Sequence, residues 1–430
     1  MKLSFRRPIA LLVSLAFLAG MLAGCSRPST PDTPSPTQDQ PAKPTQSAPE
    51  ETQEQPEDFY EITLRNFLYG AGEENRIYSP VNVYMALAML AEITDGESRS
   101  QILTLLGEKD VETLRATTSR LWLDNYIEDD FVTSIPASSL WLNQDLTFCQ
   151  DAVDTLAKYY YSTVYQGQMG SAEFDQVLQN WLNEQTNGLL EEQIHGMGFS
   201  AQTVLALATT LYFKAGWSDE FRESNTVEEV FHSPSKDNMC DFMKMSCSRN
   251  YYWGENFSAV SLSFQGSGKM WLILPNEDIG VDELLQSNSG WSDLFLSNST
   301  DDETTSKQTI EHEYLTVNLS IPKFDVSSDM HLEENLPEIG ITDVFNSEVS
   351  DFSPMIDNSI SASVSQIKHV ARVQIDEKGC EAAAFTLVMV DRAAAMLPQE
   401  EVDFILDRPF LFAITGSSGD PLFVGVVNQP

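Results

Sequence analysis

Residues 377–391 have the sequence EKGCEAAAFTLVMVD and carry the strongest structural signal in the chain. From Cys380 onward, alternate positions form two distinct faces, and no proline occurs between residues 370 and 397. One face holds only small or β-branched side chains: Cys380, Ala382, Ala384, Thr386, Val388 and Val390. The opposite face holds Glu381, Ala383, Phe385, Leu387, Met389 and Asp391. A period of two is typical of a β-strand, so the stretch is predicted to be compatible with strand conformation.

The segments around this stretch predict an α+β fold. Ser79-Pro80 suits a helix start, and the nearly continuous apolar residues after it predict a buried helix. A second helix is expected over residues 174–185, because the apolar spacing is helical and Asn187-Gly188 suits a helix terminus. Uncharged or alternating runs predict strands at residues 203–213, 270–274, 315–321, 410–415 and 422–427. Helices come early and strands late without a break in composition, which indicates one large domain.

Charge and missing motifs exclude several classes of function. The 430 residues include 64 Asp and Glu against 25 Lys and Arg, which argues against a nucleic-acid partner. The sequence has no GxSxG, HExxH or Walker motif, so no enzyme is indicated. Glu311-His312-Glu313 alternates along a predicted strand, so its side chains do not converge on an ion. No metal and no cofactor are therefore expected.

The N-terminus predicts export. Three basic residues among the first seven precede an apolar stretch over residues 9–23, which is too short for a comfortable transmembrane span. The stretch ends in Leu22-Ala23-Gly24-Cys25, which resembles the lipobox of bacterial lipoproteins. That resemblance implies that residues 1–24 are a signal peptide and that Cys25 carries lipid and anchors the protein to a bilayer. An ordinary signal peptide with an accidental cysteine is the alternative.

The region after Cys25 differs in composition from the rest of the chain. Residues 25–57 are rich in Pro, Thr, Ser and Gln and hold eight of the twenty prolines. They have no large apolar side chain and cannot bury enough surface to fold, so a disordered linker is expected. Residues 58–430 are expected to form the folded domain. The predicted location is the extracellular face of a bacterial cell membrane, either lipid-anchored or shed and secreted.

Six segments resemble signature sequences of the serpin family, and they follow the family's order across residues 58–430. They are IYSP at 77–80, NWLNEQTNGL at 180–189, YFKAGW at 212–217, IPKF at 321–324, EKGCEAAA at 377–384 with DRPF at 407–410, and PLFVG at 421–425. Each is weak alone, but six in order are highly specific.

The resemblance implies a serpin fold with three β-sheets, eight or nine helices and an exposed reactive loop. It also implies suicide inhibition of serine proteases, or in some members cysteine proteases, by a monomer. The protease attacks a bond in the loop, and the resulting covalent acyl complex is trapped when the loop inserts into the central sheet. The target protease is thus the expected partner.

The resemblance also assigns site residues. The scissile residue is the seventeenth from the hinge glutamate, so counting from Glu377 gives Ala393-Ala394, and Arg392-Ala393 is the rival bond. A small residue there suits an elastase-like or subtilisin-like protease, whereas arginine would suit a trypsin-like one. The implied hinge comprises Glu377, Gly379, Cys380, Glu381, Ala382, Ala383 and Ala384. The implied sheet-opening region comprises Ser79, Asn82, Thr209, Trp217 and His369.

Departures from the family pattern leave alternatives open. Cys380 replaces the usual Thr or Ser, and Phe385 replaces a small residue, which favours slower insertion. Asn82 and Thr209 also differ from the residues usual at their positions. His369 is expected either near Ser79 or simply as a satisfied core histidine. A non-inhibitory serpin acting as a binding or chaperone-like module is the runner-up. A lipid-anchored solute-binding protein is a third class, which would require βαβ repeats that the sequence lacks.

Overall fold

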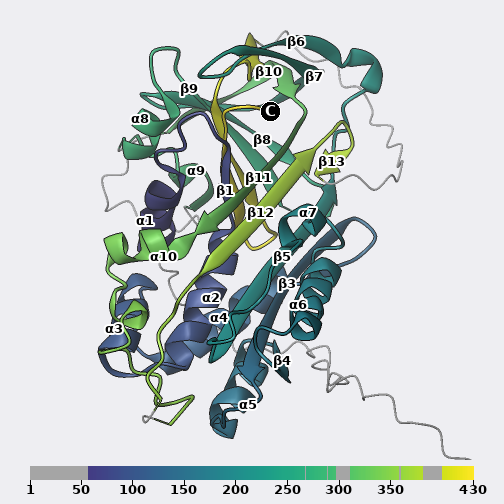
Figure 1. The fold of residues 1–430 in the computed structure, drawn as a ribbon. Coiled ribbons are helices and arrows are strands. Elements are labelled where there is room, and N and C mark those ends of the chain that lie inside the picture. The colour runs from purple at the N-terminus through teal and green to yellow at the C-terminus, as the bar shows by residue number, and fades with distance from the viewer. Residues whose placement is uncertain (1–56, 267, 288, 297–309, 358–359, 381–399) are drawn as a thin grey trace, which may run out of the picture. The chain divides into compact units, whose positions relative to one another are not determined.

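The computed structural model describes residues 57–430 except 267, 288, 297–309, 358–359 and 381–399 (Figure 1). The predicted signal peptide, the linker apart from residue 57, and the loop from residue 381 therefore lie outside the described residues. Ten α-helical segments occur in the described part, against the eight or nine expected, and three of them are four-residue turns. They are α1 (Glu57–Leu68), α2 (Pro80–Glu92), α3 (Gly96–Leu105), α4 (Val111–Asn125), α5 (Gln150–Tyr159), α6 (Ala172–Gln185), α7 (Glu191–Ile194), α8 (Val281–Gln286), α9 (Asp293–Leu296) and α10 (Leu332–Asn335).

A seven-stranded sheet contains the predicted hinge. Its strands run in the order β11-β12-β13-β5-β3-β2, and β4 pairs with β3. The bounds are β11 (Phe324–His331), β12 (Lys368–Ile375), β13 (Gly379–Cys380), β5 (Leu205–Gly216), β3 (Val132–Asn143), β2 (Ile127–Glu128) and β4 (Ser162–Gly167). The two-residue strand β13 thus lies between two long strands whose nearest ends are 152 residues apart in the chain.

The remaining strands form a nine-stranded network in the order β1-β16-β15-β9-β8-β7-β10-β14, with β6 paired to β7. The bounds are β1 (Arg76–Tyr78), β6 (Val227–His232), β7 (Asp237–Trp253), β8 (Phe257–Ser263), β9 (Lys269–Pro275), β10 (Glu311–Pro322), β14 (Glu401–Ile405), β15 (Phe410–Thr415) and β16 (Pro421–Val427). Strand β7 joins two parts of this network. Only its residues 251–253 pair with β8, whereas most of the strand pairs with β6 or β10, and β14 follows beside β10. The group β6, β7, β10 and β14 is the third sheet-like unit of the predicted α+β fold.

Helix α2 lies in the core because of its sequence. The Ser79 hydroxyl accepts a hydrogen bond from the Asn82 amide at 3.2 Å, and Pro80 occupies the first turn, so the helix starts as predicted. Almost every later residue of α2 is buried. The helix packs against β5 of one sheet and β16 of the other, which explains why it has no polar face.

Helix α6 covers the outer face of β3 and β5. Trp181 and Phe174 of α6 meet Trp141 of β3 edge-on, with ring centroids 6.3 and 5.4 Å apart. Asn187 and Gly188, which follow the helix, have φ angles of +50° and +79°, so the chain turns where the sequence predicted a terminus. The helix is thus fixed to the half of the sheet that contains β5.

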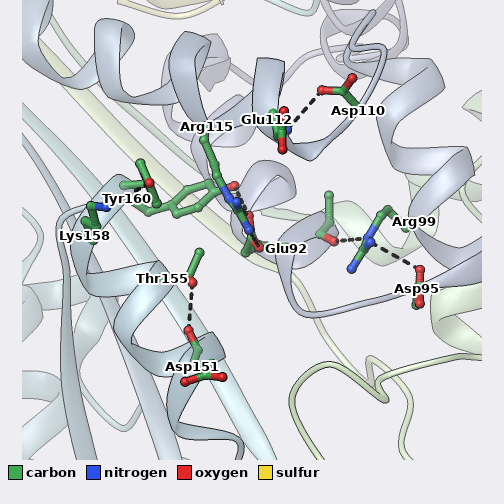
Figure 2. Close-up of polar contacts among 12 residues, drawn as sticks. Glu92, Asp95, Arg99, Asp110, Glu112, Arg115, Asp151, Thr155, Lys158 and Tyr160 are labelled. Carbon is green, nitrogen blue, oxygen red and sulfur yellow. Dashed lines mark hydrogen bonds and ion pairs between the residues drawn. The ribbon is translucent and has the colours of Figure 1, made fainter.

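A buried charge network ties three helices together (Figure 2). Glu92, the last residue of α2, is 6% exposed and accepts hydrogen bonds from Arg115 Nε at 2.9 Å and Nη2 at 2.5 Å. The Tyr160 hydroxyl, just after α5, donates to the same carboxylate at 2.9 Å. Because both partners donate hydrogen bonds to the buried carboxylate of Glu92, the network holds the end of α2 against α4 and the end of α5.

Candidate functional site

Among the described residues, the hinge strand β13 is the only strand that pairs with both β12 and β5. Cys380 pairs with Ile375 on one side and Ala215 on the other, both antiparallel. The Cys380 side chain is 3% exposed and faces the core, as its place in the alternation predicts. Gly379 pairs with Gly216, and a Cβ atom on Gly379 would lie 2.2 Å from the Ala215 carbonyl oxygen. Only glycine fits between the two strands at this point.

The base of the hinge is held by backbone and indole hydrogen bonds. The Trp217 amide donates to the Lys378 carbonyl at 2.8 Å, and its indole Nε1 donates to the Asp376 carbonyl at 2.8 Å. The indole stacks on Phe264, with centroids 5.0 Å apart and 10° between the rings. Trp217 therefore fixes the turn that joins β12 to β13.

Glu377 is anchored next to this point by its side chain. Its carboxylate accepts a hydrogen bond from the Thr226 hydroxyl at 2.7 Å and lies 3.3 Å from Lys323 Nζ. Lys323 also pairs with Asp241 at 3.1 Å. Burial alone would raise the pKa of Glu377, but the Thr226 hydroxyl and the Lys323 ammonium group outweigh it and lower that pKa. The carboxylate stays ionised and holds the hinge to the start of β6 through Thr226 and to the junction of β10 and β11 through Lys323.

A polar cluster lies under the sheet where α2 begins. The Ser79 amide donates to His369 Nε2 at 3.0 Å, so this ring nitrogen carries no proton. Asn82 Nδ2 donates to the Thr209 carbonyl at 3.4 Å, and the Thr209 hydroxyl donates to the Asn82 side-chain oxygen. Burial lowers the pKa of His369 to about 4, and the charge of Asp329 opposes this only in part. The cluster connects β12 and β5 through α2.

The structure brings together four of the five residues assigned to sheet opening. Ser79, Asn82, Thr209 and His369 form the cluster, whereas Trp217 lies at the hinge base. The rest of the predicted hinge, Glu381, Ala382, Ala383 and Ala384, lies outside the described residues, as do Arg392, Ala393, Ala394 and Cys25. Sequence reasoning missed Thr226, which supports Glu377 from 151 residues away and has no sequence signal.

The described residues show neither a group of acidic, histidine and cysteine side chains able to hold a metal ion nor a helix long and apolar enough to cross a membrane. None of the four cysteines in this part of the chain, Cys149, Cys240, Cys247 and Cys380, forms a disulfide.

The two-residue strand between β12 and β5, the anchored Glu377 and the polar cluster all lie where the serpin resemblance placed the hinge and the sheet-opening region. The chain belongs to the serpin family, since the family model described as Serpin (serine protease inhibitor) matches residues 58–430. Serpins are typically protease inhibitors, which supports the prediction that the chain is not an enzyme.

Relatives cover most of the chain at low identity. An uncharacterized serpin-like protein of Thermococcus kodakarensis is 27% identical over 444 residues, which is 99% of each chain. The plasma serine protease inhibitor of Bos taurus is 27% identical over 87% of this chain and 90% of its own. Among solved structures, the native state of the thermophilic serpin tengpin has a TM-score of 0.74 at 24% identity, covering 87% of this chain and 93% of tengpin. Arabidopsis AtSerpin1 in its native stressed conformation has a TM-score of 0.70 at 25% identity, covering 87% and 98%. These likenesses confirm the serpin fold.

Proposed function

We propose that this protein is a suicide inhibitor of extracellular serine proteases, and that it traps them by inserting residues from Glu381 onward between β5 and β12. The observation that carries the proposal is the double pairing of Cys380, with Ile375 on one side and Ala215 on the other. A chain that continues from this point in the same direction enters the sheet antiparallel to both neighbours.

Extending the observed register supports this direction of entry. Continuing the pairs of Cys380 would place Ala382 opposite Val373 and Phe213, and Ala384 opposite Ala371 and Leu211. These partners are buried, so the small side chains of the first face would enter the core. Further along the same register, Thr386 would lie opposite His369 and Thr209, so its hydroxyl would reach the polar cluster.

The energy of insertion favours a one-way trap. Each backbone hydrogen bond formed adds about 0.5–1.5 kcal/mol net, and burial of apolar side chains adds more. Over roughly ten residues the gain is on the order of 10 kcal/mol, comparable with the stability of a whole domain. The native state of such a protein persists because a barrier separates it from the inserted state.

We propose Ala393-Ala394 as the bond attacked, with an elastase-like or subtilisin-like target. The purified domain incubated with pancreatic elastase should give a covalent complex that survives a denaturing gel. Mass spectrometry should find a C-terminal fragment beginning at Ala394. A fragment beginning at Ala393, with trypsin trapped covalently, would overturn this assignment in favour of Arg392-Ala393.

The variant Ala384→Arg separates inhibition from mere binding. The register directs this side chain into the core, where an unpaired guanidinium costs several kcal/mol, so insertion should fail while cleavage continues. Ala383→Arg is the matched control, because that side chain points to the outer face. Cleavage of the wild-type loop without a covalent complex would instead support a non-inhibitory serpin.

We also propose that the protein is a bacterial lipoprotein held at the outer face of the cell membrane. The lipobox-like sequence ending at Cys25 and the proline-rich linker after it support this, because the linker gives the domain at 58–430 room to meet a protease. Cys25→Ala should release the protein from the membrane fraction. Unchanged membrane retention of that variant would contradict the lipid anchor.

A further inference from the structure

Arg372 connects the two halves of the seven-stranded sheet across the point where it would open. Its guanidinium Nη1 donates to the Leu189 carbonyl at 2.9 Å. Its Nε and Nη2 donate to the two carboxylate oxygens of Asp325 at 2.7 and 2.6 Å. Arg372 of β12 pairs directly with Ser327 of β11, and Asp325 lies two residues before Ser327 on the same strand. Leu189 belongs to the segment between α6 and α7, and Asn187 of this segment donates from Nδ2 to the hydroxyl of Tyr212 in β5 at 3.2 Å.

Beside Arg372, strands β5 and β12 form no backbone hydrogen bonds with each other among the described residues. A cavity of about 10 Å³ lies directly beyond Cys380, lined by Leu211 and Phe213 of β5 and by Arg372 and Val373 of β12. None of the described residues of β5 pairs with β12, so β13 alone bridges them by backbone hydrogen bonds. The contact of Arg372 with Leu189 is therefore a side-chain bridge across an incompletely closed part of the sheet.

The two contacts of Arg372 respond differently when the sheet opens. A strand that enters between β5 and β12 must separate them by about 4.8 Å, the spacing of neighbouring strands. A hydrogen bond of 2.9 Å does not survive such a displacement. The contact with Leu189 must break, because Leu189 stays with α6 and β5. The contact with Asp325 survives, because both residues move with β11 and β12.

We propose that the hydrogen bond from Arg372 to Leu189 is a latch that sets the rate at which this sheet opens for a new strand. The inference rests on the proposed loop insertion and names the residue that controls its speed. A slow latch leaves time for the acyl intermediate to hydrolyse, so Arg372 also sets how many inhibitor molecules are consumed for each protease trapped. Arg372 is a positioning residue, since it does not touch the reacting bond.

The test compares Arg372→Met with Asp325→Asn. The first variant removes the latch and the ion pair, whereas the second removes the ion pair alone. Two quantities are measured. The first is the rate at which the native protein converts, on mild heating, into a form that resists unfolding by urea. The second is the number of inhibitor molecules consumed per elastase molecule trapped. Arg372→Met should speed conversion about tenfold to a hundredfold, the range expected for the loss of one charge-assisted hydrogen bond. It should also bring the consumption ratio closer to one.

The outcomes separate the latch from the function on which it rests. Asp325→Asn should change the conversion rate and the consumption ratio by less than about threefold, since the hydrogen bond from Arg372 to Leu189 remains. Equal acceleration in the two variants would mean that Arg372 only stabilises β12, and an unchanged rate in Arg372→Met would refute the latch. If Arg372→Met does not fold, Arg372→Lys, which cannot hold both partners at once, gives the same comparison. A wild-type protein that neither converts nor forms a complex would refute the proposed insertion itself.

Discussion

Replacing His369 with glutamine should remove one defined component of the pH dependence of this protein's stability. The imidazole is 6% exposed, and its Nε2 accepts a hydrogen bond from the Ser79 amide, which a protonated ring could not do. A glutamine amide oxygen can take over this acceptor role but does not titrate. The variant therefore keeps an acceptor for the Ser79 amide and has no group that titrates at this position.

The size of the effect follows from the pKa. Burial lowers the pKa of His369 from 6.5 to about 4, and Asp329, which pairs with Lys368 at 2.7 Å, only partly opposes the shift. Between these two values the unfolded chain binds a proton that the folded chain does not. The stabilisation is therefore complete above about pH 7 and is lost as the pH falls toward 4. One pKa unit is worth about 1.4 kcal/mol, so wild type should lose about 2.5 kcal/mol by pH 4.5 from this residue.

Urea unfolding at several pH values between 7.5 and 4.5 measures this loss. The carboxylates titrate in both proteins, so the comparison uses the difference between wild type and His369→Gln at each pH. The difference should change by about 2.5 kcal/mol across the range, with the variant losing less stability in acid. A pH-independent difference would show that the folded histidine titrates normally and that the cluster is not closed to protons.

Two further substitutions test the anchors of the fold. Lys323→Ala should lower the free energy of unfolding by about 1–2 kcal/mol, because it leaves the Glu377 carboxylate without its cation, whereas Lys244→Ala at an exposed ion pair should cost under about 0.5 kcal/mol. Equal effects in thermal unfolding would show that the hinge anchor is merely a surface pair. Glu92→Gln should cost about 2 kcal/mol, since it leaves the Arg115 charge uncompensated in a largely buried network. A loss no larger than that of Asp124→Asn, a control at a partly exposed ion pair, would contradict the network's role.

Local sequence patterns predicted the elements whose periodicity is strong. The predicted strands at 270–274 and 410–415 correspond to β9 (Lys269–Pro275) and β15 (Phe410–Thr415). The helix start at Ser79 is also as predicted. In these elements the same residues determine both local conformation and burial, so the pattern is enough.

Strand β3 was not predicted, and its proline explains why. Pro136 lies in the middle of β3, although proline normally argues against a strand. It falls between the residues that pair with β2, which end at Ser134, and those that pair with β4, which begin at Ser138. The missing N–H therefore meets no neighbouring strand on that edge within the described residues. Only the tertiary arrangement reveals this tolerance.

Contacts between distant side chains were equally out of reach of local patterns. The position of His369 beside Ser79 was suggested by the family resemblance and not by periodicity. Arg372 has no sequence signal, because its partner Leu189 lies 183 residues away and offers only a backbone carbonyl. Such contacts depend on which strands become neighbours, and that follows from packing of the whole domain.

The central claim is that this sheet accepts its own loop as a strand, and thermal unfolding before and after a single cut tests it most directly. The intact domain is compared with the same domain nicked within residues 387–397. If the freed segment inserts between β5 and β12, the gain on the order of 10 kcal/mol should raise the unfolding temperature by roughly ten degrees or more. An unchanged or lower unfolding temperature after the cut would show that the sheet does not take up the loop, and the inhibitory mechanism would fall with it.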